Sequence, residues 1–273
     1  MYRLIASDMD DTFLGTGGVL PQANIDALRA LREMGILFVP SSGRPYPSLV
    51  SSLAKIADLL EGSYVISYNG GCINRFGDAT PLVSTTMDFQ RVSDLFCWAK
   101  ERGIGTHVYQ LDGRVWVSDM DDDDRAYVGG RMDVTEFDDP DINFLADAPM
   151  AKILFVNSDF DRLHALAREV PAELTDGLAV TFSSGRYLEF NPAGVNKGAG
   201  LTRLCEYLGI PLADTIACGD AANDREMLAA AGVGVTVANA TSEVADVADY
   251  RASATCDDGV LAEVLENLVR AQP

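Results

Sequence analysis

The segment LIASDMDDT (residues 4–12) decides how this chain is interpreted, because it joins a short apolar run to a dense acidic turn. Residues 4–6 are typical of a buried β-strand, and three carboxylates follow within four positions, at Asp8, Asp10 and Asp11. A divalent cation can neutralise such a cluster, and ligands bind at the carboxyl ends of strands in open α/β sheets. An Asp-x-Asp pair there suits phosphoryl transfer, since one carboxylate can attack phosphorus while the other handles the proton. The alternative is an acidic turn that only caps a neighbouring element.

Three further segments place polar groups at the ends of predicted strands or at the start of a predicted helix. VPSSGR (39–44) follows a second apolar run, so its hydroxyl groups lie at a strand end. GVNKG (194–198) places Lys197 just before a helical pattern, and only four lysines occur in the chain. GDAAND (219–224) again runs from an apolar strand into an acidic loop. The four segments together favour a phosphate site over an acidic turn.

In this order and context the segments resemble the four motifs of the haloacid dehalogenase-like phosphatases. They are most similar to the Cof-type sugar-phosphatase branch, with its Ser/Thr-Gly-Arg, Asn-Gly, Asn-Lys-Gly and Gly-Asp-x-x-Asn-Asp signatures. The resemblance extends from Asp8 to the segment DGV (258–260). Two departures leave the subfamily open, namely VTVANA (235–240) and the pair Ala221-Ala222.

The resemblance implies a magnesium-dependent phosphatase that hydrolyses a small phosphorylated metabolite, a sugar phosphate, through an aspartyl-phosphate intermediate. It implies that Asp8 is the nucleophile and that Asp10 protonates the leaving oxygen and then deprotonates water. Mg²⁺ prefers hard oxygen ligands. Asp8, Asp10 and Asp220 resemble those ligands, the backbone carbonyl of Asp10 included, whereas Asp224 orients ligands or waters from one layer further out.

Ser42 and Lys197 resemble the groups that hold the transferred phosphoryl group. Ser41 is a rival to Ser42, which is preferred because it directly precedes Gly43 and Arg44. Thr12 is expected to be structural and to hydrogen-bond the loop that holds Asp8. The predicted catalytic residues are Asp8, Asp10, Ser42 and Lys197; the predicted substrate-binding residues are Ser42, Gly43, Arg44, Asn69, Gly70, Lys197 and Asn223.

Three of these residues keep two interpretations. Arg44 either contacts substrate or forms a structural ion pair. Asn69 and Gly70 either offer polar contacts beside the phosphate or form a turn into the next segment. Asn223 either orients a ligand or is the N-cap of a helix over 224–231.

Alternating strands and helices at both ends of the chain predict an α/β fold with a Rossmann-like parallel sheet covered on both faces. Single helices are expected over 46–60, 223–231 and 258–270, among others. Helix-strand-strand units at both ends of 85–190 indicate an inserted α+β domain. We therefore predict a discontinuous core of residues 1–83 plus 191–273. The insertion, 84–190, would be an αββ-type cap that determines substrate specificity, as the resemblance adds.

Composition excludes several other classes for this 273-residue chain. The net charge of −20, with no basic stripe, argues against binding to nucleic acid or an anionic membrane. The sequence has no run of 18 apolar residues, so no membrane span is expected, and the residues around Arg3 are not expected to form a secretory signal. Five cysteines without a Cys-x-x-Cys pair favour reduced thiols in a cytoplasm.

Two local patterns have ordinary explanations. The only histidines, His107 and His164, both lie in the predicted cap, which argues against a histidine-based zinc site. The acidic run over 119–124 is typical of a solvated loop that leads into a helix N-terminus.

Two other functions fit the same motifs. A phosphotransferase or phosphomutase would pass the phosphoryl group to another hydroxyl. A non-catalytic regulator would bind a phosphometabolite without needing a nucleophile. Signatures of other enzyme classes are missing from the sequence, since it contains no Gly-x-Ser-x-Gly, no Gly-x-x-x-x-Gly-Lys-Ser/Thr and no complete Gly-x-Gly-x-x-Gly.

Overall fold

The chain forms two compact units in a computed structural model that describes residues 1–271. The core unit consists of Met1–Val83 and the chain from Asn196 onward, and the cap unit is Ser84–Val195. The second boundary lies after residue 195 rather than 190, because β11 (Tyr187–Pro192) still pairs along its whole length with β10 (Leu178–Ser183) of the cap.

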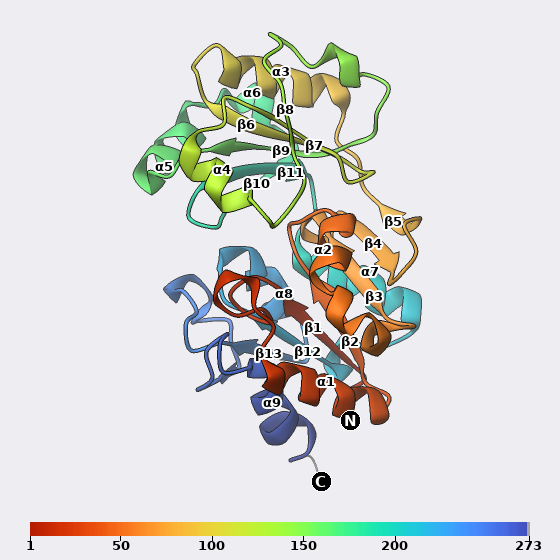
Figure 1. The fold of residues 1–273 in the computed structure, drawn as a ribbon. Helices are drawn as coiled ribbons and strands as arrows, with labels where there is room; N and C mark the ends of the chain where they lie inside the picture. The colour runs from red at the N-terminus through yellow and green to blue at the C-terminus, as the bar shows by residue number, and fades with distance from the viewer. Residues whose placement is uncertain (272–273) are drawn as a thin grey trace. The chain divides into compact units, whose positions relative to one another are not determined.

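A single eight-stranded sheet organises the core unit, in the order β14-β13-β12-β1-β2-β3-β4-β5 (Figure 1). The strands are β1 (Leu4–Asp8), β2 (Leu37–Ser41), β3 (Tyr64–Ser67), β4 (Cys72–Arg75), β5 (Pro81–Ser84), β12 (Thr215–Gly219), β13 (Val233–Thr236) and β14 (Tyr250–Arg251). Neighbours are parallel from β14 to β3, and β4 pairs antiparallel with β3. The predicted Rossmann-like parallel sheet is therefore confirmed.

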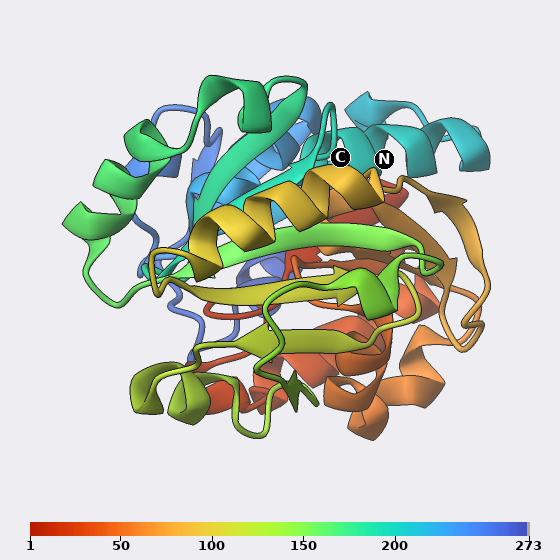
Figure 2. The ribbon, with the colours of Figure 1, turned by 90° about the horizontal axis from the view of Figure 1, so that it is seen from above.

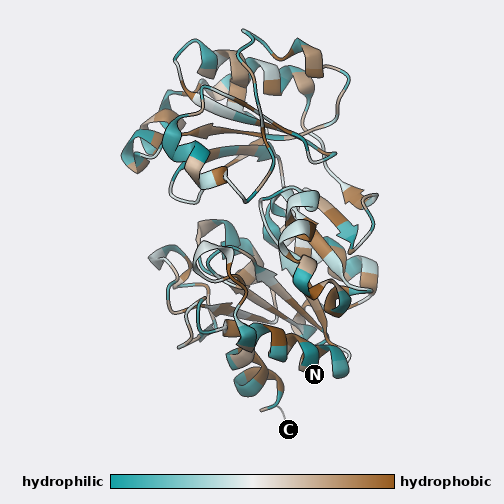
Figure 3. Cartoon of the chain, viewed as in Figure 1, coloured by the Kyte–Doolittle hydropathy of each residue, from teal (hydrophilic) through white to brown (hydrophobic). Residues whose placement is uncertain are grey.

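Helices cover both faces of the core sheet, as near-continuous apolar strands require. Buried side chains of α1 (Gln22–Glu33), α2 (Tyr46–Ser52) and α9 (Val260–Val264) share one apolar cluster with Ile5 and its neighbours. Those of α7 (Lys197–Leu208) and α8 (Arg225–Ala230) share a second cluster with Leu4 and Ala6. Alternate residues of β1 thus point to opposite layers, and Figure 3 shows the resulting apolar strands in brown.

Three predicted helices are shorter or more broken than expected. The helix over 46–60 is α2 followed by a 3₁₀ segment, Ala54–Leu60, in which Ile56 leaves helical geometry. The helix over 223–231 begins only at Arg225, after the 3₁₀ turn Ala222–Asp224. The helix over 258–270 is α9 continued by a π-helical turn, Leu265–Val269.

The cap unit is a six-stranded sheet in the order β10-β11-β9-β6-β7-β8. Its other strands are β6 (Gly105–Gln110), β7 (Val115–Ser118), β8 (Thr135–Glu136) and β9 (Met150–Val156). All neighbours are antiparallel except β7 and β8. The helices α3 (Phe89–Lys100), α5 (Phe160–Glu169) and α6 (Ala172–Thr175) share its apolar cluster, and Figure 2 shows α3 lying over the sheet.

The acidic run over 119–124 leads into α4 (Asp122–Val128), as predicted. Asp121 caps this helix, since its Oδ1 accepts a hydrogen bond of 2.7 Å from the backbone N–H of Asp124. Within residues 1–271, none of the helices is both long and apolar enough to cross a membrane.

Candidate active site

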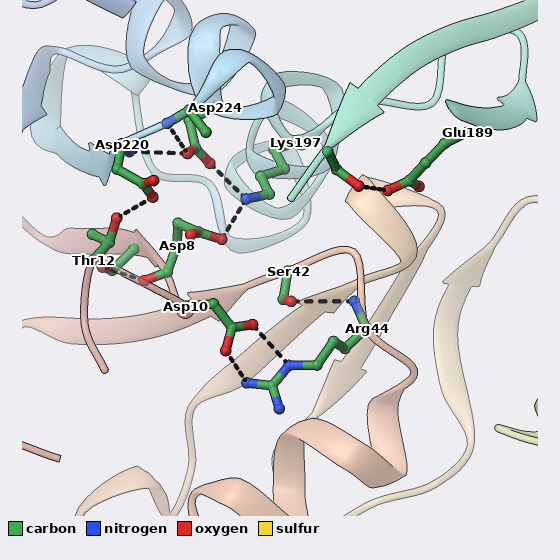
Figure 4. A network of polar contacts seen from close by, with 12 residues as sticks. Asp8, Asp10, Thr12, Ser42, Arg44, Glu189, Lys197, Asp220 and Asp224 are labelled. Carbon is green, nitrogen blue, oxygen red and sulfur yellow. Dashed lines mark hydrogen bonds and ion pairs between the residues drawn. The ribbon is translucent and has the colours of Figure 1, made fainter. Parts of the chain in front are cut away.

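The polar segments singled out in the sequence meet at one edge of the core sheet. Asp8 ends β1 and lies beside Ser41, the last residue of β2, in the parallel register. Asp220 directly follows β12, which pairs with β1 on its other side. Because these strands are parallel, their carboxyl ends bring the acidic and hydroxyl groups to the same edge (Figure 4).

Lys197 joins two of the carboxylates. Its side chain is fully buried at the start of α7, where Asn196 caps the helix by accepting a 2.7 Å hydrogen bond from the N–H of Ala199. Its Nζ donates to Asp8 and, at 2.5 Å, to Oδ1 of Asp224. A buried ammonium needs such partners, since an isolated charge in the interior is strongly unfavourable.

Asp224 is the best-connected carboxylate of the site. Its Oδ2 accepts hydrogen bonds from the backbone N–H groups of Asp220 (3.0 Å) and Ala221 (3.1 Å), while its Oδ1 accepts from Lys197. Gly219 allows Asp224 to approach the end of β12 this closely, because a Cβ at residue 219 would lie 2.4 Å from the Cβ of Asp224. Asp224 therefore holds both the loop after β12 and the ammonium of Lys197.

The carboxylates of the site strongly disfavour one another's charge. Burial raises the pKa of Asp8 well above its usual value, and the nearby Asp224 raises it further. Burial and Asp224 likewise raise the pKa of Asp220 to about 6. Burial opposes the charge of Lys197, yet Asp224 and Asp8 raise its pKa above the usual value. The site thus combines the ammonium of Lys197 with three carboxylates, so it has an excess of acidic groups.

This donor set fits a divalent cation that prefers oxygen. Asp8, Asp220 and Asp224 each offer a carboxylate oxygen, and the three oxygens lie within 4.8 Å of one another. The oxygens of Asp224 already accept three hydrogen bonds, which leaves Asp8 and Asp220 better placed to bind a cation directly. Hard oxygen ligands and uncompensated negative charge are what Mg²⁺ requires.

Thr12 has a different partner from the one expected. Its Oγ1 donates a 2.7 Å hydrogen bond to Oδ1 of Asp220, 208 positions along the chain. The prediction that Thr12 hydrogen-bonds the loop holding Asp8 was therefore wrong in its partner. The fully buried Thr12 orients a carboxylate of the neighbouring strand end instead.

Asp10 lies apart from this cluster and faces Arg44 (Figure 4). The Nε of Arg44 lies 3.0 Å from Oδ2 of Asp10, and its Nη2 donates a 3.3 Å hydrogen bond to Oδ1. The structure therefore gives Arg44 an ion pair, which was one of its two interpretations. The two carboxylates of the Asp-x-Asp pair have different cationic partners.

Ser42 and Gly43 belong to the loop after β2. The Oγ of Ser42 accepts a 3.1 Å hydrogen bond from the N–H of Arg44, and its backbone carbonyl accepts one of 3.0 Å from the N–H of Asn69. Gly43 packs against the Asn69 amide, since a Cβ there would lie 3.0 Å from Oδ1. The Oγ of the rival Ser41 is buried without a hydrogen-bond partner among residues 1–271.

Gly70 has a clear packing role. Its φ of +92° suits glycine, and a Cβ there would lie 2.2 Å from the backbone oxygen of Asn196. The Asn69–Gly70 turn is thus pressed against the loop that carries Lys197.

Asn223 does not cap a helix over 224–231, because α8 begins at Arg225 and Asp224 is its N-cap residue. It is half-buried in the 3₁₀ turn. Nothing in the described part of the chain hydrogen-bonds to its side chain, so the alternative of a ligand-orienting role stays a prediction.

Ser52 was missed in the sequence. Its Oγ accepts a 3.0 Å hydrogen bond from Nη1 of Arg44 and donates one of 3.0 Å to the backbone oxygen of Ser48. No pattern in the sequence links Arg44 to Ser52. The contact could be recognised only in the structure, where α2 ends at Ser52.

Known proteins show the same sequence pattern and fold. A sequence profile described as haloacid dehalogenase-like hydrolase matches residues 5–264. The chain is 34% identical over 248 residues to the HMP-PP phosphatase of Cronobacter sakazakii, which covers 89% of this chain and 87% of that protein. It is 30% identical over 250 residues to the HMP-PP phosphatase of Yersinia pseudotuberculosis, with 89% and 86% covered. The crystal structure of a haloacid dehalogenase-like hydrolase from Bacteroides thetaiotaomicron superposes with a TM-score of 0.83 at 29% identity, covering 98% of this chain and 100% of that one.

The fold and these relatives define the class as an α/β enzyme of the phosphatase type, a phosphoric monoester hydrolase. The chain belongs to the haloacid dehalogenase-like hydrolases.

Proposed function

We propose that the chain hydrolyses a small phosphorylated metabolite in a magnesium-dependent reaction that proceeds through an aspartyl-phosphate on Asp8. The observation that carries the proposal is the separation of the Asp-x-Asp pair into two environments. Asp8 contacts Lys197 beside the carboxylate cluster, whereas Asp10 faces Arg44. These two environments support a nucleophilic role for Asp8 and a proton-carrying role for Asp10.

In the first step, an oxygen of Asp8 bonds to phosphorus while the bond from phosphorus to the leaving oxygen breaks. Asp10 gives its proton to that oxygen, so the leaving group departs in its protonated form. In the second step, Asp10 takes a proton from water as the water oxygen bonds to phosphorus. The bond between Asp8 and phosphorus breaks, which releases inorganic phosphate and restores the carboxylate.

Lys197 and Ser42 would hold the transferred phosphoryl group between these steps. The buried ammonium of Lys197 can pair with phosphoryl oxygens as their charge develops, in a site that needs little reorganisation. Mg²⁺ would be held by Asp8, Asp220 and the backbone carbonyl of Asp10, and when bound it would neutralise phosphate charge. Asp224 would position Lys197 and the loop after β12.

Two substrate classes follow from different observations. The motif resemblance favours a sugar phosphate, whereas the names of relatives at 34% and 30% identity favour HMP-PP. We propose HMP-PP as the first candidate, because those relatives match nearly the whole chain. We further propose a cytoplasmic enzyme, since all five cysteines are free thiols.

The test is a phosphate-release screen of HMP-PP, sugar phosphates and nucleotides, with Mg²⁺ and with chelator. We expect turnover that depends on Mg²⁺ and is highest for HMP-PP. A strict requirement for a bisphosphate activator, with phosphoryl transfer to another sugar, would favour a phosphomutase instead. Undiminished turnover after the metal has been stripped would contradict magnesium dependence.

A further inference from the structure

Arg44 lies beside the proposed proton carrier but outside the carboxylate cluster. Three carboxylates, Asp8, Asp220 and Asp224, gather around Lys197 or close to it, and Asp10 is not among them. Asp10 lies only two positions from Asp8 in the chain, yet among the described residues its cationic partner is Arg44 and not Lys197.

The guanidinium of Arg44 is itself held in place. Its Nη1 donates to Oγ of Ser52, whose own hydroxyl donates to the backbone oxygen of Ser48, one turn earlier in α2. Its backbone N–H donates to Ser42, and its carbonyl accepts a 3.2 Å hydrogen bond from the N–H of Tyr68. Only 10% of the side chain is exposed, which leaves little surface for a direct contact with substrate.

The contact between Arg44 and Asp10 is attractive without being rigid. The hydrogen bond from Nη2 is long, at 3.3 Å, and the Nε–H forms no hydrogen bond within residues 1–271 although Nε lies 3.0 Å from Oδ2. Charge rather than ideal hydrogen-bond geometry thus orients the carboxylate. Asp10 stays 31% exposed and can turn toward a leaving oxygen.

We propose that Arg44, braced by Ser52, is a positioning residue that holds Asp10 away from the Lys197 cluster and ready for proton transfer. This inference rests on the proposed function, in which Asp10 is the proton carrier. Of the two interpretations of Arg44, the proposal favours the ion pair over a substrate contact. It also assigns Ser52 an indirect part in the reaction.

A double-mutant cycle of Arg44→Met and Asp10→Asn tests the proposal in the full-length protein with Mg²⁺. With an alkyl phosphate, Arg44→Met should lower kcat by roughly tenfold to 10²-fold, part of the ~10²–10⁴-fold expected for acid–base catalysis, and change KM little. In the Asp10→Asn background it should lower kcat no further. A raised KM and an undiminished loss in that background would mean that Arg44 binds substrate directly, which would overturn the proposal.

Conservative and matched variants separate positioning from general damage. Arg44→Lys should recover part of the lost kcat, because an ammonium can still attract Asp10. Ser52→Ala should lower kcat in the same direction by a few fold, whereas Ser51→Ala, its exposed neighbour on α2, should not. Equal losses in the two serine variants would contradict a bracing role for Ser52.

A crystal structure of Arg44→Met provides a readout that does not depend on turnover. The Asp10 carboxylate should lose its single orientation or move toward Lys197. An unchanged Asp10 would overturn the inference even if the variant is slow. Wild-type turnover in Asp10→Asn would instead contradict the proposed role of Asp10 in catalysis, so the two failures are distinguishable.

Discussion

At the scale of single residues, the carboxylates of the site differ in how many hydrogen bonds they already accept from the protein. The carboxylate of Asp224 accepts hydrogen bonds from Lys197 and two backbone N–H groups, whereas that of Asp220 accepts one from Thr12. Free lone pairs on Asp220 and Asp8 are therefore available to a cation. Their raised pKa values reflect the cost of leaving this charge unneutralised.

Asp220→Asn should weaken Mg²⁺ binding by at least about tenfold, because an amide replaces a carboxylate ligand, and even outer partners of metal ligands matter by 10–100-fold. Isothermal titration of Mg²⁺ into the metal-free protein measures this directly. Asp26→Asn, on the exposed surface of α1, removes the same charge and serves as the control. Equal affinities of the Asp220 and Asp26 variants would contradict Asp220 as a ligand.

The metal-free protein should depend on pH in a defined direction. The pKa of Asp220 is raised from 3.8 to about 6, so the folded state binds this proton more tightly than the unfolded state. Its stabilising contribution is then fully present below about pH 4 and is lost as the pH rises through about 6. The free energy of unfolding of wild type, relative to Asp220→Asn, should therefore fall between pH 5 and 7.5 in chelator. A constant difference across this range would contradict the raised pKa.

At the scale of elements, glycines let the loops of the site approach one another. Gly70 packs against the backbone of Asn196, and Gly198 packs against the backbone of Glu226 in α8. The signature glycines beside Asn69 and Lys197 thus let the Asn69–Gly70 turn, the start of α7 and α8 pack closely together. This packing holds the buried Lys197 beside the ends of β1 and β12.

Gly70→Ala should destabilise the core and reduce turnover, because a Cβ would lie 2.2 Å from the backbone oxygen of Asn196. Gly77→Ala is the matched control, since Gly77 has a similar φ of +86° with open space around it. The control should lose about 1–2 kcal/mol from the left-handed backbone alone. Gly70→Ala should lose about 1–3 kcal/mol more from overpacking. Urea unfolding compares them, and equal losses would show that the contact is unimportant.

The elements that the sequence predicted well are those with a clear hydrophobic period and clear end signals. The helical pattern predicted after Lys197 is α7, which Asn196 caps and Gly209 ends. The break before α8 could not be predicted, because it goes with the Asp224 carboxylate accepting hydrogen bonds from the backbone N–H groups of Asp220 and Ala221. The break after Leu53, where Ile56 leaves helical geometry, carries no signal in the sequence. Apolar periodicity continues across such breaks and hides them.

At the scale of the whole molecule, the chain consists of two units with separate apolar cores. The buried residues of the two core-unit clusters all lie outside 84–195, and those of the cap cluster all lie within that range. Each unit therefore has the apolar contacts expected of an independently folding domain.

Replacement of residues 84–195 by a short flexible linker should leave a core that unfolds cooperatively in urea. An inserted cap that closes would exclude water and add contacts to the leaving group. The excised core should therefore keep some activity on an aryl phosphate and lose its preference among natural substrates. An unchanged ranking and efficiency across the substrate screen would contradict a specificity role for the insertion.

The sequence predicted which residues gather at the site, but not which of them form hydrogen bonds or ion pairs with one another. Strand ends predicted that Asp8, Ser42 and Asp220 would share one edge of the sheet, since parallel strands align their carboxyl ends. The pairing of Thr12 with Asp220 and of Arg44 with Asp10 joins residues 208 and 34 positions apart. Such contacts depend on side-chain directions in the folded molecule, which no local pattern specifies.

The central claim is that Asp8 forms the aspartyl-phosphate and Asp10 transfers the proton. Rapid acid quench with a ³²P-labelled aryl phosphate tests it, because an aryl leaving group needs little protonation. Asp10→Asn should accumulate labelled protein, with dephosphorylation slowed by roughly 10²–10⁴-fold, and peptide mapping should place the label on Asp8. Asp8→Asn should remain unlabelled. Label on Asp8→Asn and none on Asp10→Asn would show that the two roles are reversed.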